Sequence, residues 1–200
     1  MDADSAEIRV LGCLIEKQRT TPDVYPLSLN ALRLACNQST NRDPVVDYDE
    51  PTIREALARL DHKRWARLAS GPGSRAAKYR HLLDDALGLD GAEISVLAVL
   101  MLRGAQTPGE LKLRTERLHH FGSPEEVERL LELLAGRELA RSVGRRPGQK
   151  EDRWVQLLGS EEEPGAEPAQ APAPSRSPLE DRVAALEREV AELKRRLDGD

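Results

Sequence analysis

Apolar residues recur at helical spacing in six places along this chain, and one order of elements occurs twice. Apolar side chains three and four positions apart are typical of one face of an amphipathic helix, whereas short apolar runs beside Gly and Pro favour strands. The helical spacing covers residues 5–18, 28–35, 51–60, 91–103, 108–119 and 124–135. Short strands are expected near residues 65–69, 78–82, 138–143 and 152–158. Each half therefore has three helices followed by two strands, which predicts a mostly helical α+β fold.

The two halves are related by an internal repeat. Trp65 matches Leu139 at a spacing of 74 residues, and Tyr79 matches Trp154 at a spacing of 75. An earlier Thr-Pro pair recurs at a spacing of 86, so the first copy contains about 12 extra residues. A long, fixed spacing is typical of a duplicated unit, and about 75 residues suffice for a separate core. The sequence predicts two winged-helix domains in tandem, residues 1–88 with an inserted loop at 37–50, and residues 89–158.

The C-terminal part has a different character. Residues 159–178 contain five of the 13 prolines, which predicts a disordered, Pro-rich linker. Residues 179–198 show a heptad seam with Val at a and Leu at d, typical of a two-stranded parallel coiled coil. The dimerisation candidates are the seam residues Leu179, Val183, Leu186, Val190, Leu193 and Leu197. A homodimer is expected, with a solitary amphipathic surface helix as the alternative.

The net charge of −5 lies outside the predicted domains, because residues 1–158 carry equal numbers of acids and bases. Residues 62–83 contain six Lys and Arg and no carboxylate. A local patch of one sign indicates more about partners than the overall charge does. The chain has only six aromatic residues, which argues against a base-stacking surface for single-stranded nucleic acid.

The remaining composition indicates the compartment. No run of 18 apolar residues and no secretory signal is visible, so we expect a cytoplasmic protein with no membrane contact. Cys13 and Cys36 fall on apolar helical positions, which favours buried thiols over a disulfide or metal site.

Several long motifs resemble one family of bacterial proteins. Residues 14–18, 20–32 and 35–45 carry the stretches LIEKQ, TTPDVYPLSLNAL and ACNQSTNRDPV. In the second half, residues 107–111 and 146–151 carry TPGEL and RPGQKE. Over roughly residues 5–158 the chain resembles the YceH family. This resemblance implies a tandem winged-helix fold and adds neither an enzymatic activity nor a partner.

The inserted loop contains two candidates for nucleic-acid contact. Asn41 and Arg42 carry the amide and guanidinium groups that suit phosphates or base edges. The alternative is local structure, in which Arg42 pairs with Glu16 or Asp43 and the polar side chains form turns. We favour the structural interpretation, because Asp43 beside Arg42 weakens a phosphate site.

The third helix and the hairpin, or wing, of the first domain are better placed for DNA. In a helix-turn-helix, the recognition helix enters the major groove and contacts bases through its N-terminal residues. Glu55 within this helix and the acids just before it, Asp47, Asp49 and Glu50, oppose that role, and a solvated charged surface is the alternative. The nucleic-acid-binding candidates are Asn41, Arg42, Arg54, Arg59, Lys63, Arg64, Arg75, Lys78, Arg145, Arg146 and Lys150.

The second domain is a poorer DNA reader. Its third helix carries four glutamates against Arg129 alone, and DNA phosphates would repel it. The hairpin cations Arg145, Arg146 and Lys150 could still contact a backbone. We expect this domain to pack against the first domain or against another chain.

Catalysis has little support in the sequence. The histidines His62, His81, His119 and His120 form no metal-ligand spacing with the cysteines or carboxylates. No Gly-rich phosphate loop or HExxH motif is present. We therefore expect no enzymatic activity, no cofactor and no metal. The leading hypothesis is binding of double-stranded DNA, and the alternative is a protein-interaction scaffold resembling chromosome-segregation winged-helix factors.

Overall fold

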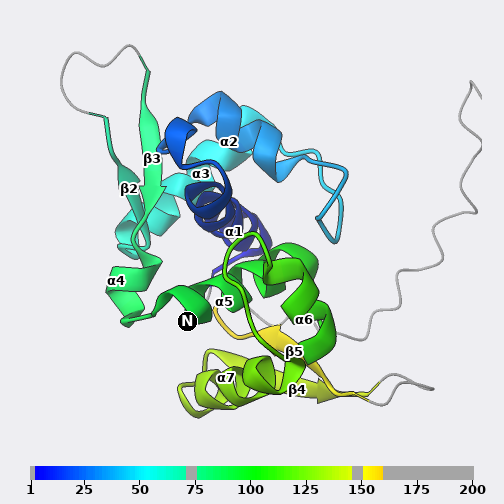
Figure 1. Ribbon diagram of the computed structural model, residues 1–200. Helices are drawn as coiled ribbons and strands as arrows, with labels where there is room; N and C mark the ends of the chain where they lie inside the picture. Colours follow the sequence, from blue (N-terminus) through cyan, green and yellow to red (C-terminus); the bar gives the residue numbers. More distant parts are fainter. Residues whose placement is uncertain (1–2, 71–75, 146–150, 160–200) are drawn as a thin grey trace, which may run out of the picture. The chain divides into compact units, whose positions relative to one another are not determined.

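Helices make up most of the chain that the structure describes. The computed structural model describes residues 3–70, 76–145 and 151–159. Its elements in chain order are α1 (Ser5–Thr20), η1 (Pro22–Val24), β1 (Leu27–Ser28), α2 (Leu29–Cys36), α3 (Glu50–His62), β2 (Ala66–Leu68), β3 (Lys78–His81), α4 (Leu83–Leu87), α5 (Gly91–Arg103), α6 (Pro108–Thr115), α7 (Pro124–Gly136), β4 (Ala140–Gly144) and β5 (Arg153–Gln156). The mixture of helix and strand, with helix in the majority, agrees with the hydrophobic pattern (Figure 1).

The longer elements lie where the hydrophobic pattern predicts them. Each of the six predicted helices and four predicted strands overlaps one observed element. Residues 37–49, which lie in the predicted inserted loop, contain neither helix nor strand. The pattern does not predict η1, β1 and α4, because elements of two to five residues are too short to show a period.

Reciprocal caps define where three of the helices begin. The side chains of Asp4, Asp90 and Thr107 each accept a hydrogen bond from the backbone N–H three residues later, and the glutamate there bonds back to the cap residue. This capping box satisfies two backbone N–H groups that have no partner inside the helix. The starts of α1, α5 and α6 therefore follow from local sequence.

Two small antiparallel sheets follow the helices. The first has the strand order β1-β3-β2, with Arg67 opposite Arg80 and Leu27 opposite Tyr79. The second consists of β4 and β5. A single antiparallel bridge from Gln106, just before α6, to Trp154 takes the place that β1 has in the first half. Each half therefore ends in a hairpin that is tied back to the residues before its second helix.

The backbone repeats at the start of each hairpin. Arg64 and Glu138, which are 74 residues apart, both adopt left-handed conformations with φ of 59° and 58°. The next residues, Trp65 and Leu139, donate their N–H groups to Leu60 and Leu134 in the preceding helices. Because L-residues rarely adopt positive φ, its recurrence at the same spacing supports the duplication found in the sequence.

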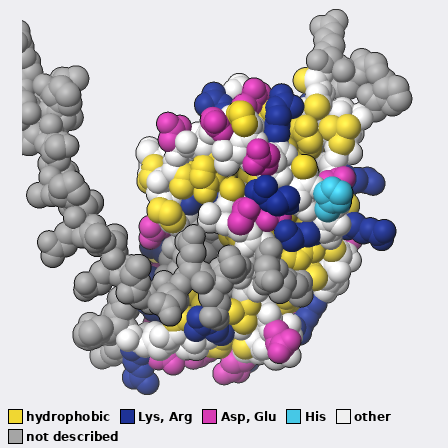
Figure 2. Space-filling model, turned by 180° about the vertical axis from the view of Figure 1, so that it is seen from behind, with side chains coloured by type: hydrophobic (Ala, Val, Ile, Leu, Met, Phe, Trp, Pro, Cys, Tyr) yellow, Lys and Arg dark blue, Asp and Glu magenta, His cyan; other side chains and the backbone are white. Residues whose placement is uncertain are grey.

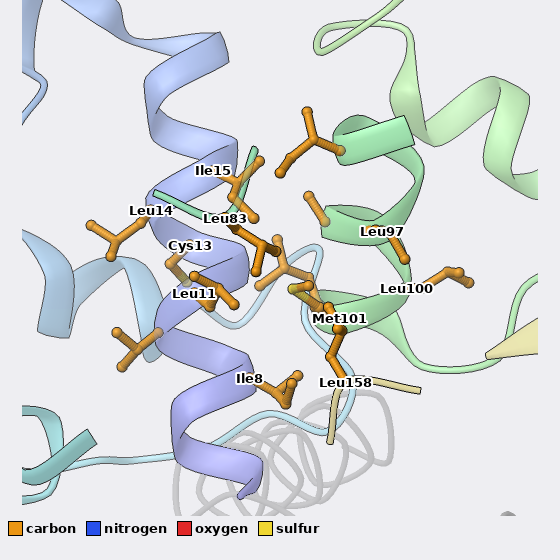
Figure 3. Packing of buried hydrophobic residues seen from close by; sticks show 14 of the residues in the cluster. Ile8, Leu11, Cys13, Leu14, Ile15, Leu83, Leu97, Leu100, Met101 and Leu158 are labelled. Atoms are coloured by element: carbon orange, nitrogen blue, oxygen red, sulfur yellow. The ribbon is translucent and has the colours of Figure 1, made fainter. Parts of the chain in front are cut away.

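The two halves share a hydrophobic core along α1 and α5, which form the most extensive helix–helix contact. Figure 3 shows Leu11 and Ile15 of α1 in the space between these helices, with Met101 of α5 and Leu83 of α4. All four side chains are buried. The described residues belong to one compact unit, Met1–Glu162, and the predicted boundary at residue 88 falls inside it.

A glycine permits the close approach of these two helices. A Cβ added at Gly12 would lie 3.0 Å from Cγ of Leu102 and 3.1 Å from Cβ of Met101. Both distances are shorter than ordinary contacts between carbon atoms. A larger residue at position 12 would therefore separate α1 from α5.

The predicted C-terminal elements cannot be compared with the structure. Apart from residue 159, the linker at 159–178 lies outside the described residues. The coiled coil at 179–198, with all six of its seam residues, lies outside them as well. The predicted homodimer therefore stays a prediction.

Candidate nucleic-acid interface

Arg42 lies in the loop after α2 and points into the protein. Its Nη1 and Nη2 donate to Oε1 and Oε2 of Glu16 at 3.1 and 2.6 Å, and its side chain is 0% exposed. Its Nε donates to the carbonyl of Ala35 at 3.1 Å. The ion pair with Glu16 that the structural interpretation expects is present, and the guanidinium group is engaged inside the protein.

The two charges of this pair stabilise each other. Burial opposes ionisation of Glu16, but the hydrogen bond and the charge of Arg42 outweigh it and lower the pKa of Glu16. Burial likewise disfavours the charged form of Arg42, but the hydrogen bond and the charge of Glu16, together with Cys13, outweigh it and raise the pKa of Arg42. The neighbouring Asn41 is exposed, and its Oδ1 accepts a hydrogen bond from Arg103 of α5.

Two more of the nucleic-acid-binding candidates, Arg59 and Lys63, form ion pairs with acids at the start of α1. Nζ of Lys63 lies 2.5 Å from Oε1 of Glu7, whose side chain is only 2% exposed. Arg59 lies 2.7 Å from Asp4 and 3.5 Å from Glu7. These contacts join the end of α3 to the start of α1. Arg59 and Lys63 therefore contribute less to an outward positive field than their charges suggest.

The exposed side of α3 carries more acid than base. Glu50, Glu55 and Asp61 are exposed, as is Arg54, which lies 3.6 Å from Glu50. A helix with this surface would meet the phosphates of a major groove with net repulsion. Arg64 follows α3 and is exposed.

The hairpin β2–β3 has an outer face without carboxylates. Arg67 lies directly opposite Arg80, and Lys78 is two residues before Arg80 on the same side of β3. We call Arg67, Lys78 and Arg80 the hairpin cations. No acid is present in β1, β2 or β3, and no described carboxylate forms an ion pair with any of the hairpin cations.

Like charges directly opposite each other destabilise a strand pair. The pair Arg67–Arg80 is such an arrangement, and Nε of Arg80 is buried without a hydrogen-bond partner among the described residues. An anion bound to the two guanidinium groups would relieve this repulsion. The geometry therefore suits an anionic partner at this face.

Buried side chains on the opposite face hold the hairpin in position. Ala66 and His81 are each 1% exposed, and the N–H of His81 donates to the hydroxyl of Tyr25 at 2.8 Å. Nε2 of His81 contacts Oε1 of Gln18 in α1, and Nδ1 lies 3.5 Å from Asp84. Burial lowers the pKa of His81 to about 4, against the opposing effect of Asp84. His81 is therefore a neutral, structural residue at pH 7.

The second half presents a different surface. Arg145 follows β4 and lies 3.0 Å from Asp152 across the hairpin. On α7, Glu125, Glu126, Glu128 and Glu132 are exposed, together with Arg129. Figure 2, which shows the side opposite that of Figure 1, has Lys and Arg mixed with Asp and Glu rather than gathered in one patch.

The structure brings together only part of the predicted set. Arg59 and Lys63 meet at Glu7, whereas Arg64 and Lys78 lie at opposite ends of the first hairpin, because Lys78 is beside Ala69. Arg75, Arg146 and Lys150 lie outside the described residues. Arg67 and Arg80 are missing from the predicted set, although both belong to the acid-free stretch 62–83. Their alternation with Leu68 and Tyr79 was the signal that could have placed them on one face with Lys78.

Within residues 3–70, 76–145 and 151–159, no three His, Cys, Asp or Glu side chains gather as a metal site requires. Cys13 and Cys36 are buried free thiols, as the sequence predicts. A hydrogen bond with Cys13, together with burial, raises the pKa of Cys36. No helix in the described residues is long and apolar enough to cross a membrane.

Comparison with known proteins identifies the family. The protein-family model described as "Protein of unknown function, DUF480" matches residues 3–149 of this chain. A UPF0502 protein of Serratia proteamaculans (strain 568) is 44% identical over 205 residues, covering 99% of this chain and 95% of the relative. UPF0502 protein YceH of Salmonella paratyphi A (strain ATCC 9150 / SARB42) is 44% identical over 202 residues, covering 98% of this chain and 94% of the relative. A UPF0502 protein of Solibacter usitatus (strain Ellin6076) is 48% identical over 192 residues, covering 96% of this chain and 93% of the relative. The chain therefore belongs to the DUF480 family, whose relatives carry the names UPF0502 and YceH, and the predicted resemblance is confirmed.

Proposed function

We propose that this protein is a non-enzymatic tandem winged-helix protein that binds the backbone of double-stranded DNA through the hairpin cations of its first half. One observation carries the proposal: Arg67, Lys78 and Arg80 share one face of an acid-free hairpin, with Arg67 opposite Arg80. Three helices followed by a hairpin, with a further strand before the second helix, support the winged-helix assignment.

The charges favour contact with phosphates over recognition of bases. Phosphate contacts position a protein on DNA without regard to sequence, whereas bases are read in the grooves by closely fitting side chains. The acidic exposed side of α3 disfavours major-groove entry, although the sequence alone gave that helix a leading role. Binding is therefore expected to be weak and nearly independent of sequence, with a Kd of about 1–100 μM at physiological salt.

The proposed setting is the bacterial cytoplasm. Cys13 and Cys36 are free thiols, which is typical of a reducing compartment. The protein is proposed to act as a homodimer joined through the predicted C-terminal coiled coil. A dimer would present two hairpins to one duplex and raise the apparent affinity.

Charge reversal on the hairpin tests the proposal. Fluorescence anisotropy with several 20-bp duplexes of different sequence would compare the wild type, R67E/K78E and the matched control R54E/R129E. We expect similar wild-type affinity for every duplex, at least about tenfold weaker binding by R67E/K78E, and little change in the control. Equal loss in both variants would contradict a role specific to the hairpin, and no wild-type binding at ~50 mM salt would refute DNA binding.

A protein-interaction scaffold is the second candidate function. It is favoured by the exposed leucines Leu113 on α6 and Leu133 on α7, which are 76% and 64% exposed, and by the glutamates around Leu133. An exposed apolar side chain within an acidic surface suits a basic, partly apolar partner better than DNA. If the wild type binds no duplex, this candidate takes precedence.

A further inference from the structure

A pocket of about 400 Å³ lies between the two halves of the described chain. Its walls come from the end of α1, the loop after α2, the end of α5, and α6 with the turn that follows it. Small-molecule sites commonly have volumes of this order and occur where structural units meet. Its position is separate from the hairpin cations, none of which lines it.

The lining of this pocket is strongly basic. Its cations are Lys17, Arg103, Arg114 and Arg117, and its only carboxylate is Glu16. Glu16 is already engaged by both terminal nitrogens of Arg42, and Lys17 lies 3.4 Å from the same carboxylate. Arg42 and Lys17 therefore share this carboxylate, and the charges of Arg103, Arg114 and Arg117 are not compensated by it.

Two of the arginines retain donors for a ligand. Arg117 is exposed and forms no ion pair with the described residues, and Arg114 lies 3.7 Å from Glu110, a long ion-pair distance. Arg103 uses one terminal nitrogen to contact Asn41. Burial and the charges of Arg114 and Arg42 lower the pKa of Arg103, against Glu16 and Glu110. The cations of the pocket thus repel one another in the absence of an anion.

We infer that this pocket binds a small phosphorylated molecule, with its phosphate held by Arg103, Arg114 and Arg117. Guanidinium groups match the geometry of phosphate oxygens by donating two parallel hydrogen bonds. The apolar lining residues Val99, Leu102, Leu113 and Leu118 would contact the uncharged part of the molecule. The volume admits a molecule of about mononucleotide size or smaller.

Binding at this position would stabilise the contact between the halves. Lys17 belongs to α1 and Arg114 to α6, so one ligand would contact both halves of the chain. A ligand that binds only the folded protein raises its melting temperature progressively as the ligand concentration increases. The inference is independent of DNA binding, because it rests on a different set of residues.

The test uses the full chain with inorganic pyrophosphate and AMP as probes. Isothermal titration calorimetry and thermal unfolding would compare the wild type, R114Q/R117Q and the control R54Q/R129Q, which removes two cations from α3 and α7. Sodium chloride at matched ionic strength controls for general salt effects. Lys17→Gln provides a second variant on the opposite wall of the pocket.

We expect saturable binding of at least one probe by the wild type and the control, with a rise in melting temperature that matched chloride does not reproduce. Binding by R114Q/R117Q should be weaker by at least about tenfold, and Lys17→Gln should show a smaller loss. Lack of saturable binding by either probe, or unchanged binding by R114Q/R117Q, would overturn the inference. Displacement of bound probe by a duplex oligonucleotide would assign the pocket to DNA instead.

Discussion

Arg42 and Arg67 are both arginines of the first half, but their side chains have different roles in the fold. Arg42 is enclosed and bound to Glu16, whereas Arg67 is exposed on β2 opposite another arginine. Sequence composition locates the charges and does not show which of them face solvent, because long-range partners such as Glu16 and Arg42 are 26 residues apart. The alternative that Arg42 pairs with Glu16 could be formulated from sequence, but only the fold decides it.

Removal of Arg42 should destabilise the protein. Arg42→Gln is expected to lower the free energy of unfolding by about 2–4 kcal/mol, because it leaves the Glu16 carboxylate without its buried partner. The double variant R42Q/E16Q should recover part of that loss, since it has no buried carboxylate without a partner. Urea unfolding of the wild type, the two single variants Arg42→Gln and Glu16→Gln, and the double variant at pH 7 measures the coupling between the two side chains. If Arg42→Gln lowers the free energy of unfolding by less than ~1 kcal/mol, water replaces Arg42 as the partner of the Glu16 carboxylate.

His81 should make stability depend on pH. Its pKa is about 4 when folded and 6.5 as the ordinary value, so the unfolded chain binds the proton first as the pH falls. This contribution is complete above pH 6.5 and is lost between pH 6.5 and 4. The loss amounts to about 3 kcal/mol.

Denaturant unfolding of the wild type and His81→Gln across this pH range tests that expectation. The variant starts from a lower stability because it alters a buried contact with Gln18, but its stability should change less with pH. Parallel pH profiles for the two proteins would show that groups other than His81 cause the pH dependence.

At the scale of elements, periodicity predicts the long helices well and the short elements poorly. α1 and α5 have apolar positions at helical spacing and capping boxes at Asp4 and Asp90, so both pattern and local chemistry agree. β1 has two residues and exists because β3 pairs with it, which is a long-range cause that no local pattern contains. The pairing of Arg67 with Arg80 likewise depends on strand register.

The contact between α1 and α5 should be sensitive to one methyl group. Gly12→Ala is expected to cost about 1–3 kcal/mol, because its Cβ would lie 3.0 Å from Leu102 and force the helices apart. Gly136→Ala in α7 is the matched control, since nothing lies near its added Cβ. The control should gain up to about 1 kcal/mol from helix propensity. Thermal unfolding compares them, and a neutral Gly12→Ala would show that the helices adjust without cost.

At the scale of the whole molecule, the sequence repeat predicts two copies of the same order of helices and strands. It does not predict how the two copies pack against each other, which only the structure shows. The spacing of 74 residues recurs in the backbone at Arg64 and Glu138. Apolar periodicity shows that α1 and α5 each have a buried face, but it does not show that those faces meet. The pocket between the halves has the same origin, because its walls come from segments far apart in the sequence.

The C-terminal segment should control association of the chain. Val at a and Leu at d favour a two-stranded coil, and fewer than three heptads make it weak. Replacing Leu186 and Leu193 by Asp would place charges in the seam and should yield a monomer with an unchanged melting temperature. Sedimentation velocity would compare the full chain, L186D/L193D and a chain ending at Leu158. One shared oligomeric state in all three would exclude the coil as the dimer contact.

The salt dependence of DNA binding tests the central claim most directly. If about four cations contact phosphates, log affinity should fall with log salt at a slope of about −3 to −4, since each contact contributes about −0.9. R67Q/K78Q should make the slope shallower by about 2 units, and R54Q/R129Q should leave it unchanged. A wild-type slope near zero, or equal slopes in the wild type and R67Q/K78Q, would contradict backbone binding by the hairpin cations.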